Sequence, residues 1–247
     1  MSALYAAELL KLRTLRSTWG FVVVTLLFAG LVTAGNIGGA TPSERLDPDL
    51  QSRITLDIAF PTSVLALLLG IILVTNEFRH GTIARTLLAT PRRGRFVVAK
   101  LLTGATVGVW LTIAALAVAL VTTLIWLGAL DIPLEPGELG DGAWRAFVAA
   151  LVAGVLGAAV GGAVHSQVGA LVGTLMWIFV LEPICWVLLA LLDVDAVADY
   201  LPAAALGGMV DSEGEGLSWL RSVGVACGWV TVAAVLGFFR TNRRDIT

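Results

Sequence analysis

The sequence predicts an all-α membrane protein that crosses the bilayer about six times. Of its 247 residues, 57% are hydrophobic and only 14% are charged, against about 25% charged residues in soluble domains. The apolar residues form blocks of about 20, which is long enough to cross a hydrocarbon layer of roughly 30 Å as a helix. A helix also satisfies its own backbone hydrogen bonds, as lipid requires.

The blocks define six predicted spans within one transmembrane domain of residues 1–247. We expect the spans at about 18–37, 58–76, 101–130, 143–164, 168–192 and 217–239. The third block is long enough to tilt or to project beyond the bilayer. Only His165, Ser166 and Gln167 separate the fourth span from the fifth, so these two helices should be adjacent and antiparallel.

Two further segments fit short helices at the membrane surface. In residues 1–17, Tyr5, Leu9 and Leu12 lie near one helical face, on which Glu8 intrudes. A plain helical extension of the first span is the alternative for this segment. The outer loop, residues 193–216, contains the apolar stretch Ala196–Leu206, which fits a second interfacial helix.

The distribution of Lys and Arg predicts the orientation, because these residues concentrate in short cytoplasmic loops. If the N-terminus is inside, the inner segments hold 12 of the 16 basic residues, and the outer segments hold 14 of the 18 acidic residues. We therefore expect both termini in the cytoplasm and the chain in the cell membrane.

Glycine pairs spaced by four residues predict close helix packing in the spans. The three pairs are Gly104 with Gly108, Gly157 with Gly161, and Gly169 with Gly173. We expect packing within the chain, and a dimer face is the alternative.

The chain lacks the residue patterns of P-loop ATPases, zinc proteases and intramembrane serine proteases. No Gly-Lys pair occurs, so a phosphate-binding P-loop is absent. The only histidines, His80 and His165, do not form a His-Glu-x-x-His zinc motif. Ser218 follows a glycine-leucine pair as in some intramembrane serine proteases, but both histidines map to the opposite side of the membrane. We expect no catalytic residues, no bound metal or cofactor, and no nucleic-acid partner.

Glu182 and Pro183 mark a special point in the fifth span. A carboxylate within a span is costly and is a candidate for the translocation path. Pro183 removes a backbone hydrogen bond and should kink or break the helix. The alternative for Glu182 is structural: it bonds freed backbone groups or pairs with Arg221. A single such carboxylate argues against an ion-coupled transporter.

The inner loop, residues 77–100, is too long and too apolar for a simple connection. Gly81 and Thr82 allow a helix to start, and Pro91 stops it. Ile83, Leu87 and Leu88 then form the apolar side of a short amphipathic helix over 82–90. The neighbouring Arg92, Arg93 and Arg95 could hold lipid phosphates. A purely basic membrane anchor is the alternative for this loop.

Two motifs in the chain resemble those of permeases of the type-2 ABC exporter family. In the inner loop the matching residues are Glu77, Arg79, Gly81, Thr82, Leu87, Leu88, Ala89, Pro91, Arg95 and Lys100. Near the N-terminus they are Glu8, Lys11, Arg16, Ser17 and Trp19. The length, the six spans and the lack of a fused ATPase agree with the same family.

The resemblance implies a permease that exports an amphipathic small molecule, drug, antibiotic or lipid. Its coupling helix would dock on separate ATPase subunits, two of them, which bind ATP and Mg. It would also pair with a second permease copy or a homologous permease. The residues implied in coupling are Glu77, Arg79, Gly81, Thr82, Ile83, Leu87, Leu88 and Pro91. The main alternative is a membrane anchor or sensor subunit that transports nothing.

Overall fold

The computed structural model describes residues 2–41, 44, 57–81, 93–132, 136–210 and 217–242. Across these ranges the secondary structure is helical and contains no strand. Six helical segments are long and apolar enough to cross a membrane, and they match the six predicted spans. The expected helix over 82–90 lies outside the described residues, as do Pro91 and Arg92.

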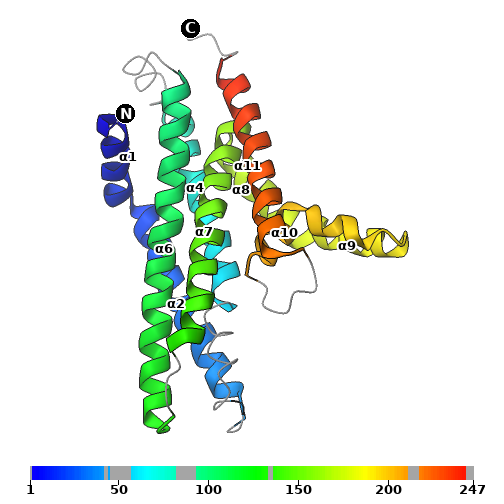
Figure 1. Ribbon diagram of the computed structural model, residues 1–247. Coiled ribbons are helices and arrows are strands. Elements are labelled where there is room, and N and C mark those ends of the chain that lie inside the picture. The colour runs from blue at the N-terminus through cyan, green and yellow to red at the C-terminus, as the bar shows by residue number, and fades with distance from the viewer. Residues whose placement is uncertain are drawn as a thin grey trace.

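The helices follow one another along the chain as shown in Figure 1. They are α1 (Ser2–Thr14), α2 (Arg16–Gly39), α4 (Ala59–Arg79), α6 (Arg93–Ala129), α7 (Pro136–Val164), α8 (Gln167–Met176), the π-helical turn η2 (Trp177–Leu181), α9 (Glu182–Leu191), the 3-10 helix η3 (Asp195–Tyr200), α10 (Pro202–Gly208) and α11 (Trp219–Asn242). With 37 residues, α6 is about 55 Å long at 1.5 Å per residue, as expected of the third span.

The centre of the bundle is α7, which packs against α4, α6 and α11. Glycines let the backbones touch: a Cβ at Gly108 would overlap the carbonyl oxygen of Ala150, and one at Gly157 would overlap that of Leu67. Two of the three predicted glycine pairs therefore lie at helix contacts. The third pair makes no such contact among the described residues, because a Cβ at Gly173 would meet nothing within 4 Å.

α1 is a helix of its own and not an extension of the first span. Leu15 lies between α1 and α2 in an extended conformation, with φ −75° and ψ 123°. In Figure 1, α1 runs beside the upper part of α6. The hydroxyls of Tyr5 and Thr106 form a 2.6 Å hydrogen bond between these two helices.

The outer loop does not form one interfacial helix over Ala196–Leu206, so that prediction was wrong. Leu201 is extended, and Pro202 starts a new helix, α10, at its first turn. Leu206 and Met209 are buried among side chains of α4, α7 and α11. The short helix therefore belongs to the core of the bundle.

A methyl group added at Gly157 should destabilise the protein, because it would overlap the Leu67 carbonyl oxygen on α4. Overpacking of this kind costs about 1–3 kcal/mol. Thermal unfolding in detergent should show a lower midpoint for Gly157→Ala. Gly162→Ala, on the same helix but with no neighbour within 4 Å, is the matched control and should keep the native midpoint. Equal midpoints for the two variants would contradict the packing described here.

Candidate functional site

Two lysines and two glutamates from three helices form a charge cluster, consisting of Glu8 and Lys11 of α1, Glu77 of α4 and Lys100 of α6. Lys100 Nζ donates to Glu8 Oε2 at 2.6 Å and to Glu77 Oε1 at 2.7 Å. Lys11 Nζ donates to Glu8 Oε1 at 2.7 Å and to Glu77 Oε1 at 2.5 Å. Each ammonium group thus bridges both carboxylates, and the formal charges cancel.

Three members of the charge cluster are buried. Glu8, Glu77 and Lys100 are 3%, 5% and 4% exposed, whereas the side chain of Lys11 is 43% exposed. Removing charges from water costs several kcal/mol per ion unless good partners offset the loss. The alternating arrangement supplies those partners, so each charge in the cluster depends on the others.

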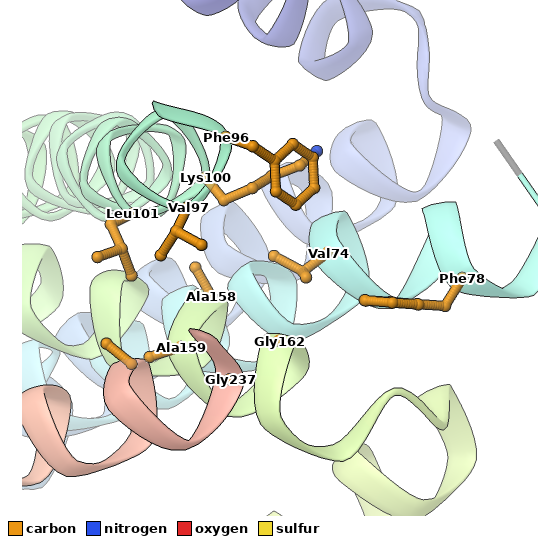
Figure 2. A pocket seen from close by; sticks show the side chains of 11 residues that line it. Val74, Phe78, Phe96, Val97, Lys100, Leu101, Ala158, Ala159, Gly162 and Gly237 are labelled. Carbon is orange, nitrogen blue, oxygen red and sulfur yellow. The ribbon is translucent and has the colours of Figure 1, made fainter. Parts of the chain in front are cut away.

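An apolar wall surrounds the Lys100 side chain. Its Nζ lies 5.5 Å from the centroid of the Phe96 ring, and Figure 2 shows these two side chains next to each other. Phe96 and Lys100 line a small pocket with a volume of about 30 Å³, and Val74 and Phe78 of α4 line it as well. This wall keeps the buried part of the charge cluster in a medium of low dielectric constant, where charge interactions are strong.

The sequence of α1 explains how Glu8 reaches Lys100. Tyr5, Glu8 and Leu12 are spaced by three and four residues, so they share one face of the helix. All three meet the rest of the bundle: Tyr5 bonds Thr106, Glu8 bonds Lys100, and Leu12 is fully buried. Glu8 therefore does not disturb an apolar face; it is the polar centre of the face that packs on α6.

The partners of Glu8 and Lys11 shift their pKa values in opposite directions. Burial would raise the pKa of Glu8, but the charge and hydrogen bonds of Lys100 and Lys11 outweigh it and hold the pKa below its usual value of 4.5. Burial would lower the pKa of Lys11, but hydrogen bonds to Glu77 and Glu8 raise it above the usual 10.5. Both groups are therefore charged at neutral pH.

The predicted inner loop is shorter in the structure than in the sequence analysis. α4 extends to Arg79 and α6 starts at Arg93, so Glu77 and Lys100 lie in helices and not in a loop. Gly81 follows the end of α4 with a left-handed φ of 63°. It belongs to the C-terminal turn of α4, a position that favours glycine.

The remaining predicted coupling residues are only partly described. Arg79 Nη1 donates to Gln167 Oε1 on α8 at 3.2 Å, which links the end of the second span to the start of the fifth. Arg95 is exposed on α6. The following predicted residues lie outside the described ranges: Thr82, Ile83, Leu87, Leu88, Pro91 and Arg92.

Glu182 is also buried and fully engaged. It is 3% exposed, and its carboxylate accepts hydrogen bonds from Trp177 Nε1 at 2.6 Å, Ala203 N at 3.0 Å and Ala204 N at 2.6 Å. The two backbone donors belong to the first turn of α10, whose N–H groups have no partner within the helix. Among the described residues, Glu182 forms no ion pair with Arg221. Its described partners are thus an indole N–H and the backbone of α10, which the sequence did not indicate.

The predicted interruption of the fifth span at Pro183 takes the form of a wide turn. The π-helical turn η2 directly precedes Glu182 and Pro183, and such turns are rare and are frequently found at functional sites. In Figure 1, α9 then leaves the bundle at a steep angle to α6 and α7.

The two motifs contain Glu8, Lys11 and Lys100, for which the sequence indicated no role. A usable signal was present: Lys11 and Lys100 are the only lysines, and Lys100 stands in the apolar run from Phe96 to Leu102.

No protein-family model matches the chain, and no curated protein matches it.

Lys100→Met should strongly destabilise the protein, because it leaves an unbalanced negative charge in the cluster. Breaking a buried ion pair by removing one partner costs about 3–5 kcal/mol. Thermal or denaturant unfolding in detergent measures the loss. Arg13→Met, at an exposed position of α1, is the control and should change the free energy of unfolding by less than about 0.5 kcal/mol.

Glu8→Met combined with Lys100→Met should recover much of that stability, since the remaining pair, Lys11 with Glu77, is again neutral. A double-mutant cycle then gives a favourable coupling energy between Glu8 and Lys100. Additive losses in the cycle would show that these two groups do not stabilise each other.

Protonation of the Glu8 carboxylate in acid should weaken the attachment of α1 to the bundle. A carboxyl group with a lowered pKa stabilises the fold above its unfolded-state pKa, and this contribution is lost as pH falls through the folded-state pKa. The difference in thermal midpoint between wild type and Glu8→Gln should thus be constant at neutral pH and shrink below about pH 4.5. Lys11 has a raised pKa, so its contribution is lost only above about pH 10.5. A difference that does not change with pH would contradict the assignment.

Proposed function

We propose that this chain is the membrane-spanning permease subunit of an ATP-driven exporter, coupled to separate ATPase subunits through residues 82–92. The observation that carries the proposal is the charge cluster, because it ties together the two helices that lead into and out of that segment. Glu77 lies two residues before the end of α4, and Lys100 lies seven residues after the start of α6.

The charge cluster gives a mechanical reason for such coupling. A partner that moves residues 82–92 would pull on α4 and α6 together, because Lys100 and Lys11 hold both helices to α1. The close glycine contacts of α4 and α6 with α7 then extend the rigid unit to the centre of the bundle. For ATP to drive the permease from one state to another, the free energy of ATP binding must differ between those two states. A rigid connection from residues 82–92 to the bundle would transmit the movement of the ATPase to the transmembrane helices.

Docking would use the apolar side of the predicted coupling helix, formed by Ile83, Leu87 and Leu88. An amphipathic helix that places its apolar side in a groove is a common mode of recognition. Arg92, Arg93 and Arg95 would bind lipid phosphates beside it. The distribution of basic residues favours a cytoplasmic position for this segment and for both termini, in a chain that would lie in the cell membrane.

The complex would contain two permeases, identical or homologous, and two ATPases with ATP and Mg. Its cargo would be an amphipathic small molecule, drug, antibiotic or lipid, as the resemblance implies. Glu182 would contribute to the fold, because its carboxylate accepts three hydrogen bonds, two of them from the backbone of α10. The main competing function is a membrane anchor or sensor subunit.

Coexpression with ABC ATPase subunits from the same genome tests the proposal. The native permease should copurify with an active ATPase in lipid, and Leu87→Asp combined with Leu88→Asp should abolish copurification, because charges cannot enter an apolar groove without a large cost. Leu10→Asp is the control, since Leu10 is an exposed leucine of α1; it should retain the ATPase. Equal recovery of ATPase with the native and the double-Asp protein, or none with either, favours the anchor or sensor function.

A further inference from the structure

An apolar cavity of about 300 Å³ lies beside the π-helical turn, between η2, α7, α10 and α11. Its inner wall includes Ile178 of η2 and Leu206 of α10, which are buried. Its outer wall includes Val232 and Leu236 of α11, which are about half exposed. The cavity therefore reaches from the core to the surface of helices that span the membrane.

The fifth span and Glu182 create this cavity together. After the wide turn at Trp177–Leu181, α9 points away from the bundle, so among the described residues the second half of the fifth span does not pack against it. Glu182 then holds the first turn of α10 in place through Ala203 and Ala204. With only seven residues, α10 fills part of the space beside η2, and the cavity is the part that it does not fill.

The polar groups of the two indole rings in the wall already have partners. Trp177 Nε1 donates to Glu182 at 2.6 Å, and Trp229 Nε1 donates to the carbonyl oxygen of Tyr200 at 3.0 Å. The rings consequently offer carbon surface to the cavity. Among the described residues that line the cavity, all except Thr174 are aliphatic residues or one of these tryptophans. A ligand with a buried polar group would have little to bind.

We propose that the cavity binds one hydrocarbon chain of a membrane lipid. Apolar cavities about half this size stay dry and accept apolar guests, because an empty void deprives its lining of dispersion contacts. The half-exposed Val232 and Leu236 open the cavity sideways, at the surface where lipid chains are the most abundant apolar species. The lipid headgroup stays outside, since the wall supplies no charged side chain to receive it.

Photolabelling in proteoliposomes tests the site directly. The probe is a phosphatidylcholine that carries a diazirine on one acyl chain, and mass spectrometry locates the adducts. The expected result is labelling of Leu206 or Ile178, which are 2% and 9% exposed and are reached only from within the cavity. Labelling confined to lipid-facing residues such as Val235 would overturn the proposal.

A cavity-filling substitution provides the second arm. Ala233→Phe, on the wall of the cavity, should reduce labelling of Leu206 and Ile178 at least fivefold. Val235→Phe, two residues along α11 and outside the cavity, is the control and should leave that labelling unchanged. If Ala233→Phe lowers the unfolding midpoint, Ala163→Leu fills the cavity from α7 instead. Unchanged labelling in the filled variants would overturn the site, and labelling by a free diazirine alkane but not by the phospholipid would overturn the assignment to lipid.

Discussion

The structure depends first on the rule that a charge removed from water needs an opposite charge or a set of hydrogen bonds beside it. Glu8, Glu77 and Lys100 are buried among apolar helices, and none of them would be tolerated alone. Their mutual contacts fix how α1, α4 and α6 lie relative to one another. The same contacts make the ends of α4 and α6 one mechanical unit, on either side of residues 82–92, which is the basis of the proposed coupling.

The rule also governs the opposite part of the bundle. Glu182 is buried with no ion pair among the described residues, and it is satisfied by an indole N–H and by two backbone N–H groups of α10. This set of hydrogen bonds orders the short helix that follows the fifth span. The sequence left a structural role for this carboxylate open, but it did not indicate α10 as the partner; the cavity beside η2 lies next to these contacts.

Between these two polar centres, the helices pack closely because glycines at their contacts carry no side chain. Gly108 and Gly157 bring α6 and α4 into contact with the backbone of α7, where lipid offers no hydrophobic driving force and close approach supplies the attraction. The fifth span lacks such contacts: Gly173 has no neighbour within 4 Å, and most side chains of α9 are exposed. The bundle thus combines a closely packed group of α4, α6 and α7 with a fifth span that is held at Gln167 by Arg79 and at Glu182 by α10.

The sequence by itself determined the six spans, the long third helix, the close glycine contacts of Gly104, Gly108, Gly157 and Gly161, and the disruption at Pro183, because each is encoded by local hydrophobicity or residue size. Only the tertiary structure decided the partners of the charges. Glu8 and Lys100 are 92 positions apart in the chain, and Glu182 and Ala203 are 21 apart, so no local pattern connects them. The burial of α10 was missed for the same reason: an apolar stretch looks alike in sequence whether it meets lipid or the core, and only its neighbours in space distinguish the two.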